Sequence, residues 1–455
     1  MKINTPQTAT LQFESDNGIL EQGFVWAKKQ AMEFVHNGND KVGLWYEAAL
    51  PEREAFCIRD VSHQRFGAAV LGLGLHTKNM LKAFARSISV NRDYCMFWEI
   101  NKDNLPAPVD YTNDKNFWYN LPANFDMLWA CWQEYLWTKD PDYLNDPEML
   151  NFYELTCTEY VSRWDKDGDG ILEYYPQNGC RGIASYNEVG QSPYFAADMI
   201  GAQYAGFIAY ANILKCQGET EKANVFCEKA AVLKNLYLED WYNSEEKRFY
   251  GAKITKDSFA DFYWAEGHFL PLYFGILSNN SKSGNALTYI LENGVSNVEG
   301  KSYLPRIYYQ YGAVKEAYKH LTELCEPTLN RREYPEVSFS FLGVLINQYM
   351  GIQAGVDYDF CTLPQLVNKK EKSSLKHLPV GGGFADVSHV GNNFTKVKNL
   401  GGKEIQWQAA FYGDFKFLYV DGSMINAQKE TDETGRVYSF VKVNLKPGIT
   451  ASVCY

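Results

Sequence analysis

Apolar residues recur at helical spacing along most of the chain. The segment from Tyr194 to Gln217 is apolar on nearly every face, which predicts an enclosed helix. The next segment, from Thr220 to Tyr242, turns Lys and Glu outward and apolar residues inward, which predicts an outer helix. Patterns of this kind predict helices at Gly18 to His36, Ser62 to Ile88, Ala123 to Thr138, Leu150 to Trp164, Tyr194 to Gln217, Thr220 to Tyr242, Phe262 to Leu277, Ala286 to Asn293, Ala313 to Cys325 and Val337 to Met350.

Enclosed and amphipathic helices that alternate over such a length predict paired helices. The arrangement fits a mainly α fold, an (α/α)6 toroid in which inner helices form a barrel and outer helices wrap it. Six hairpins need twelve helices, two more than the segments above supply. We expect the missing pair within Ser62 to Ile88 and around Ser302 to Gln310.

The pattern changes after about Cys361. A Lys-rich linker leads to short alternating segments bounded by Gly, Asp and Pro-Gly, such as Phe415 to Gly422 and Val437 to Leu445. Alternation of this kind predicts strands. We therefore expect a toroid catalytic domain over residues 1–365 and a small C-terminal β-sandwich over residues 366–455.

Composition narrows the function. The 455 residues carry a formal net charge of −11, which argues against nucleic acid or an anionic membrane as a partner. No apolar run reaches the length of a membrane span. Aromatic residues make up 15% of the chain, which fits a carbohydrate substrate, although a large helical core that uses aromatics would look the same.

The ten cysteines show neither CxxC pairs nor regular spacing, so we expect mostly buried free thiols. These thiols suit a cytoplasmic protein. A removed leader would instead indicate a periplasmic or extracellular one. The oligomeric state stays open.

A charged run lies between Leu50 and Gln64, where an apolar helix begins. Charged groups at the mouth of a buried helix must find partners or serve a function. Upstream, Trp45 adds an aromatic face, and aromatic surface beside charged acceptors suits a sugar. The run therefore predicts a sugar site, and a solvated turn with compensating Arg/Glu pairs is the alternative.

Hydrolysis of a glycosidic bond needs one carboxylic acid to protonate the leaving oxygen and a second carboxylate to activate water or to attack. The charged run offers Glu54 and Asp60, and far downstream Glu333 and Glu336 precede another apolar helix. The first and last hairpins of a toroid are neighbours, so we expect these two clusters to meet at one rim. Alternatively, Glu333 and Glu336 only complement the dipole of the helix that follows them.

Two further motifs bear on binding. Trp264, Glu266 and His268 open a predicted helix with groups suited to stacking on and gripping a sugar, although core packing and capping explain them equally well. Residues 165–173 resemble the first half of a calcium loop, but position twelve is Pro176 instead of Glu. This favours a loop rich in Asx turns, and we expect no metal and no cofactor.

Taken together, these residues resemble the six-hairpin toroid glycosidases, and most of all the inverting α-L-rhamnosidases. Pro51, Arg53 and Glu54 match their Pro-x-Arg-Glu motif, whereas Ala49 stands where the family has an Asp. The resemblance implies that Glu54 is the general acid and that Asp60 binds sugar hydroxyls. The pair formed by Arg59 and Asp60 is also similar to the pair with which glucoamylase-type toroids hold a terminal sugar.

The resemblance extends to weaker matches. Asp126 lies in a segment similar to a substrate-binding helix, and residues 338–343 resemble the helix after the catalytic base, which implies that Glu336 or Glu333 is that base. Glu188 occupies a place where some toroid hydrolases keep a carboxylate and is a reserve candidate for the acid. Rhamnosidases of this type carry large N-terminal β-domains, and this sequence shows none.

The sequence therefore predicts an exo-acting, inverting glycosidase with Glu54 as acid and Glu336 or Glu333 as base. A polysaccharide lyase and a non-catalytic glycan-binding protein are the alternatives. The expected substrate-binding residues are Trp45, Arg53, Arg59, Asp60, His63, Asp126, Glu188, Trp264, Glu266 and His268.

Overall fold

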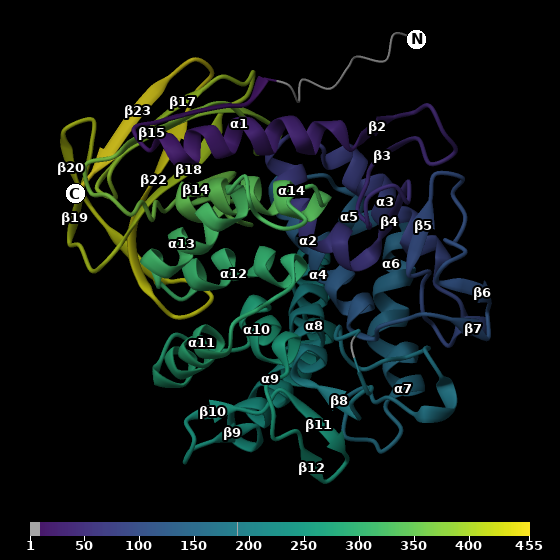
Figure 1. Ribbon diagram of the computed structural model, residues 1–455. Helices are drawn as coiled ribbons and strands as arrows, with labels where there is room; N and C mark the ends of the chain where they lie inside the picture. Colours follow the sequence, from purple (N-terminus) through teal and green to yellow (C-terminus); the bar gives the residue numbers. More distant parts are fainter. Residues whose placement is uncertain (1–9, 189) are drawn as a thin grey trace.

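A closed ring of helices forms the centre of the protein (Figure 1). The computed structural model describes residues 10–188 and 190–455. Each ring helix packs against the next, and the last packs against the first. In ring order they are α2 (Ile58–Val70), α4 (Pro122–Thr138), α8 (Ala197–Gln217), α10 (Ala265–Tyr273), α12 (Val298–Gln310) and α14 (Pro335–Val344).

A second set of helices packs on the ring, one of them indirectly through another helix of the set. These are α1 (Gly18–Glu33) against α14, α3 (Gly74–Ser87) against α2, α6 (Pro147–Leu155) against α3, α9 (Thr220–Asp240) against α8, α11 (Ser281–Asn293) against α10 and α13 (Val314–Cys325) against α12. The short helix α5 (Asp142–Asn145) packs on α6, which continues through a π turn at Thr156–Tyr160 into α7 (Val161–Trp164). Both predicted positions of additional helices are confirmed, because Ser62 to Ile88 contains two helices and Ser302 to Gln310 lies in α12.

Local chemistry explains several of these boundaries. Gly72 has φ +78°, a conformation that favours glycine, and separates α2 from α3. Pro335 occupies the first turn of α14, where its missing N–H costs nothing. At Gly67 a Cβ would lie 2.1 Å from the backbone oxygen of Phe339, so glycine allows α2 and α14 to pack closely.

Two large sheets lie beside the ring, at the upper left of Figure 1. The seven-stranded sheet has the order β1 (Gln12–Ser15), β15 (Lys372–Val380), β16 (Gly383–Val390), β17 (Phe394–Asn399), β23 (Thr450–Cys454), β19 (Phe417–Val420) and β20 (Ser423–Asn426). The five-stranded sheet has the order β13 (Ile352–Gln353), β14 (Phe360–Thr362), β18 (Ile405–Tyr412), β22 (Val437–Leu445) and β21 (Gln428–Thr431).

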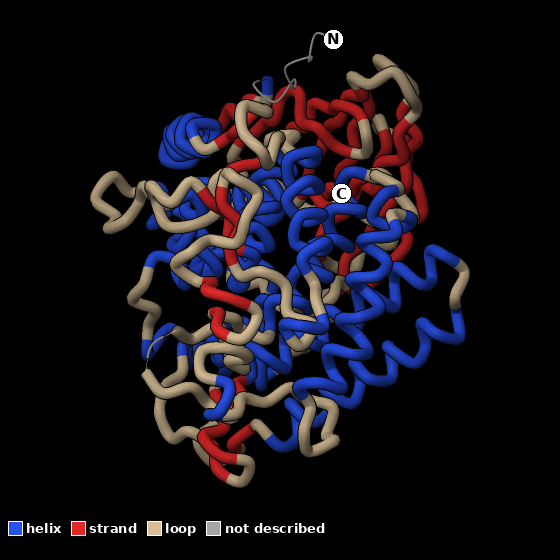
Figure 2. The backbone as a smooth tube through the Cα atoms, turned by 90° about the vertical axis from the view of Figure 1, so that its right-hand side faces the viewer, coloured by secondary structure: helices blue, strands red, loops and turns tan. Residues whose placement is uncertain are grey.

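Both C-terminal segments predicted as strands contain them, β19 in one and β22 in the other. The sheets also take in β1, β13 and β14, which come before residue 366. All paired strands of the two sheets are antiparallel except β14 and β18, which run parallel. In Figure 2 the large sheets lie together at one end of the molecule while helices fill its middle.

Short strands occur in the connections between helices. They pair as β2 (Val35–Asn37) with β3 (Leu44–Tyr46), β4 (Ala55–Cys57) with β5 (Glu99–Asn101), β6 (Tyr111–Asn113) with β7 (Asn116–Phe117), β9 (Tyr242–Asn243) with β10 (Arg248–Phe249), and β8 (Phe195–Ala196) with β11 (Ala252–Thr255), which also pairs with β12 (Ser258–Phe259). The β4–β5 pair holds the charged run against the start of α2.

The ten cysteines are free thiols, and six of them are buried. Within residues 10–188 and 190–455, no helix is long and apolar enough to cross a membrane.

Candidate active site

The ring helices bring acidic residues together at their N-terminal ends. Five of these helices carry an acid in the first turn: Asp60 in α2, Asp198 in α8, Glu266 in α10, Glu299 in α12 and Glu336 in α14. A helix N-terminus carries partial positive charge and stabilises a nearby carboxylate. The closed ring therefore concentrates carboxyl groups from distant parts of the sequence at one place.

Arg59 supplies a cation to this cluster. Its guanidinium lies 4.9 Å from the ring centroid of Tyr186 and 5.8 Å from that of Tyr303, and Nη1 donates a hydrogen bond to the Tyr186 carbonyl at 3.4 Å. The charges of Glu266 and Glu188 act on it. Nη2 is buried and has no hydrogen-bond partner among the described residues, so Arg59 keeps a donor for a bound ligand.

Asp60 and Glu336 both have strongly raised pKa values. Burial raises the pKa of Asp60 to about 7, against the favourable charge of Arg59 and together with the repulsion of Glu188. Glu336 is buried, and its pKa lies well above the usual range because of burial and the charge of Asp60. Both carboxyl groups therefore hold their protons more strongly than free acids do.

Glu188 lies in the loop that leads to β8 and α8, where its side chain reaches solvent. The protein around it raises its pKa by desolvation, and the charges of Asp110, Glu266 and Glu299 raise it further, whereas Arg59 opposes them. Glu188 is thus an acid at the rim that holds its proton more strongly than a free glutamate.

Arg53 forms ion pairs with two acidic residues of the protein. Its Nη1 donates to Glu99 Oε2 at 2.8 Å and lies 3.9 Å from Asp110 Oδ2. Burial raises the pKa of Asp110 to about 6, with the charge of Glu99 adding to the effect. Arg53 therefore fixes two carboxyl groups near Glu188 and Asp60 instead of presenting a free guanidinium.

Two of the predicted catalytic acids lie at the surface. Glu54 is exposed, has φ +47° and forms an ion pair with Lys102. Glu333 is also exposed, three residues before the buried Glu336. Of the two downstream candidates, the structure thus places Glu336 within the cluster.

His63 and Asp126 lie inside the ring. His63 Nε2 is 2.8 Å from both Ser302 Oγ and Ser340 Oγ, and its ring stacks on Tyr303 with centroids 3.7 Å apart. Burial and nearby arginines lower the pKa of His63, which keeps the imidazole neutral. Asp126 accepts a hydrogen bond from the Tyr186 hydroxyl at 3.0 Å, and burial raises its pKa to about 7. Both groups support the floor of the cluster.

The aromatic candidates have packing partners. Trp45 is buried, stacks on His36 with centroids 4.0 Å apart and donates to Asp40. Trp264 is also buried, with Nε1 donating to Ser185 Oγ at 3.3 Å.

His268 is buried beside Trp264, and its Nδ1 donates to the Trp264 carbonyl at 2.6 Å. Of the motif over residues 264–268, Glu266 belongs to the acidic cluster.

Sequence reasoning missed Asp198 and Glu299. Asp198 accepts a hydrogen bond from the backbone N–H of Tyr186 at 2.5 Å, and burial raises its pKa to about 7. Its signal in the sequence is an acid in the first turn of an otherwise apolar helix. Glu299 lies two residues after Asn297, whose side chain caps α12. Its signal in the sequence is a capping residue followed by an acid at a helix start.

One acidic loop could hold a metal ion. Oxygens of Asp165, Asp167, Asp169 and Glu173 all lie within 4.8 Å of one another. This loop follows α7 and is separate from the cluster at the ring.

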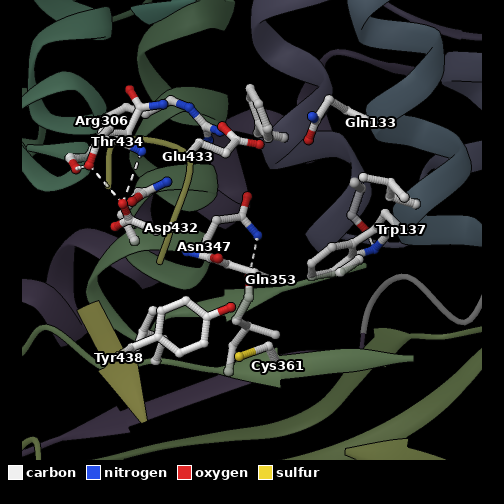
Figure 3. A pocket seen from close by; sticks show the side chains of 18 of the residues that line it. Gln133, Trp137, Arg306, Asn347, Gln353, Cys361, Asp432, Glu433, Thr434 and Tyr438 are labelled. Atoms are coloured by element: carbon white, nitrogen blue, oxygen red, sulfur yellow. Dashed lines mark hydrogen bonds between the residues drawn. The ribbon is translucent and has the colours of Figure 1, made fainter. Parts of the chain in front are cut away.

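A cavity of about 250 Å³ lies at the opposite end of the ring helices, next to the five-stranded sheet (Figure 3). Arg306, Glu433 and Gln133 face it from one side and Tyr438 and Cys361 from the other. Burial and the neighbouring Arg65 lower the pKa of Arg306 to about 10, whereas Tyr273 and Glu433 oppose that shift. This cavity is formed by the C-terminal ends of the ring helices, so it is distinct from the acidic cluster.

No known family model and no curated protein sequence matches the chain. Solved structures do. An α-L-rhamnosidase from Dictyoglumus thermophilum is 14% identical with a TM-score of 0.62, over 97% of this chain and 50% of that one. An α-L-rhamnosidase from Aspergillus terreus is 12% identical with a TM-score of 0.57, over 96% of this chain and 50% of that one.

A glycosidase variant solved in complex with glucose is 10% identical with a TM-score of 0.53, over 73% of this chain and 98% of that one. The chain thus spans about half the length of the rhamnosidases and nearly all of the glycosidase. It has the fold of solved glycosidases, as the resemblance in the sequence indicates.

Proposed function

We propose that the protein is a glycoside hydrolase that removes terminal sugars, with the closed ring as the barrel of an (α/α)6 toroid. The observation that carries this proposal is the group of acids with raised pKa values around Arg59 at the N-terminal ends of the ring helices. Glycosidases need one carboxylic acid that keeps its proton and one carboxylate on the other side of the sugar. Residues 1–365 and 366–455 remain the proposed catalytic and β-sandwich domains.

Glu188 is the proposed general acid. An exo-acting enzyme holds the terminal sugar inside its pocket and leaves the departing group at the mouth. Glu188 reaches solvent at the rim, and its raised pKa favours the protonated form that a general acid needs. This role replaces the one that the resemblance gives to Glu54, whose exposed carboxylate is paired with Lys102.

Glu336 is the proposed base. It is buried, whereas Glu188 reaches solvent, and the charge of Asp60 acts on it, so it would lie on the enclosed side of a bound sugar. In this proposal Glu336, once ionised, takes a proton from the attacking water, and Asp60 hydrogen-bonds to a sugar hydroxyl. Arg59 completes the grip on the sugar through its unused Nη2.

We propose inversion at the anomeric carbon because the sequence resembles inverting enzymes, in which the acid and the base leave room for a water between them. The sequence resemblance and two solved neighbours make α-L-rhamnosides the first substrates to test.

The test is a panel of nitrophenyl glycosides and oligosaccharides, with the product anomer followed by proton NMR from the first minutes of reaction. The proposal predicts release of a single terminal sugar with inverted configuration, and loss of this activity in Glu336→Gln. An unsaturated product that absorbs in the ultraviolet would show a lyase instead. Binding of oligosaccharides without any turnover would show a glycan-binding protein.

A further inference from the structure

The loop between α7 and the approach to α8 gathers four carboxyl groups. Asp165, Asp167 and Asp169 occupy alternate positions, and Glu173 follows at the ninth position of the loop. In a twelve-residue calcium loop the bidentate closing ligand stands at position twelve, which is Pro176 here. The fold supplies the fourth carboxylate from Glu173 instead, since its oxygen lies within 4.8 Å of the ligand atoms of the three aspartates.

Glu173 provides a second and independent observation. The residue has no exposed surface. Its Oε2 accepts hydrogen bonds from the Lys166 N–H at 3.0 Å and the Tyr175 hydroxyl at 3.3 Å. Its Oε1 is buried and has no hydrogen-bond partner in the described part of the chain. A buried carboxylate oxygen without a donor is costly, and a cation removes that cost.

Backbone hydrogen bonds hold this loop in a closed turn. Asp165 accepts hydrogen bonds from the N–H groups of Gly168 at 2.7 Å and Gly170 at 3.0 Å, which hold the turn closed. Lys256 pairs with Asp167 Oδ2 at 2.8 Å, but most of its side chain is exposed and it can swing away. The charge of Lys253 also acts on Asp169, but neither lysine contacts all of the four carboxyl groups.

We propose that Asp165, Asp167, Asp169 and Glu173 form a calcium site. The donors are all oxygens, whereas zinc and copper prefer nitrogen and sulfur ligands. A flexible loop with several carboxylates suits Ca²⁺ better than Mg²⁺, which requires a stricter octahedral geometry.

The bound ion ties the end of α7 to the ring. Glu173 N–H donates to the Trp164 carbonyl at 3.2 Å, and Gln203 of α8 donates to the Gly170 carbonyl at 2.7 Å. The site therefore braces the connection that leads to the loop of Glu188. Its proposed role is structural, and it can be tested without measuring turnover.

The test is thermal unfolding and calorimetric titration of the chelator-treated full chain with CaCl₂ and, separately, MgCl₂. We expect binding of one Ca²⁺ per chain and a rise in Tm of several degrees, with Mg²⁺ at equal concentration giving a smaller rise. Glu173→Gln and Asp169→Asn should each abolish the calcium-dependent rise. In chelator, Glu173→Gln should keep a Tm no lower than that of the unmodified chain, because it removes one of the mutually repelling carboxylates.

Asp257→Asn is the matched control, because Asp257 is an exposed carboxylate in the neighbouring β11–β12 turn. This variant should respond to calcium like the unmodified chain. A Tm and a titration that do not respond to calcium would overturn the proposal, as would an equal calcium response in Glu173→Gln. The readout is independent of turnover, so it stands apart from the test of the hydrolase.

Discussion

The carboxylate of Asp60 raises the pKa of Glu336, because α2 and α14 pack side by side and both groups lie in the first helical turn. The two residues are far apart in the sequence and become neighbours only when the ring closes. Arg59 is the residue next to Asp60, and its positive charge offsets part of the repulsion between the two carboxylates.

Replacement of Asp60 by Asn should raise stability at high pH while lowering activity. Burial raises the pKa of Asp60 from 3.8 to about 7, so the folded state keeps a proton that the unfolded state releases. Stability therefore falls as the pH rises from about 4 to 7, and Asn removes this loss. We expect Tm to rise by a few degrees at pH 8 and little at pH 4, with activity reduced roughly 100-fold.

Thermal unfolding at both pH values checks this prediction. Asp103→Asn, which changes an exposed carboxylate paired with Lys41, should show no such pH-dependent gain. A lower Tm for Asp60→Asn at pH 8 than for the unmodified chain would contradict the proposed repulsion.

His63→Leu should act mainly on stability. The side chain bridges Ser302 and Ser340 inside the ring, and its loss leaves two buried hydroxyls without that partner. We expect a loss of about 2–4 kcal/mol in the free energy of unfolding, and about 1 kcal/mol for Ser340→Ala. Chemical denaturation measures both values. An unchanged stability with weakened sugar binding would instead make His63 a sugar ligand.

Gly67→Ala should disrupt the ring. The added Cβ would lie 2.1 Å from the Phe339 carbonyl oxygen, so α2 and α14 would have to separate. We expect a loss of about 3 kcal/mol or more, or failure to fold. Gly284→Ala is the matched control, because no atom lies within 4 Å of its added Cβ and Ala favours the helix α11 by about 0.5–1 kcal/mol. Similar Tm values for the two variants would contradict the close packing.

Helical periodicity predicted most of the helices, because each buries an apolar face that repeats along the sequence. It merged α2 and α3 into one segment, since Gly72 interrupts the chain without interrupting the apolar pattern. It also could not place β1 with the C-terminal strands, because pairing between Phe13 and Leu375 is a long-range contact.

The candidate site was harder to predict. Glu54 and Asp60 look alike in a charged run, but Glu54 lies exposed in the turn before β4, where it pairs with Lys102, and Asp60 lies in the first turn of α2. Glu299 and Asp198 carried only the weak signal of an acid at a helix start. The burial of Glu173 could not be predicted from the sequence, because it depends on how the loop packs around α7.

The central claim is that Glu188 and Glu336 are the acid and base, and a comparison of leaving groups tests it most directly. Rates of Glu188→Gln, Glu336→Gln and Glu54→Gln should be measured on an alkyl glycoside and on its dinitrophenyl counterpart. Because dinitrophenolate leaves without protonation, we expect Glu188→Gln to lose at least about 100-fold on the alkyl glycoside and far less on the activated one. Glu336→Gln should lose activity on both, and Glu54→Gln on neither. Full activity of Glu188→Gln on the alkyl glycoside, together with its loss in Glu54→Gln, would contradict the account.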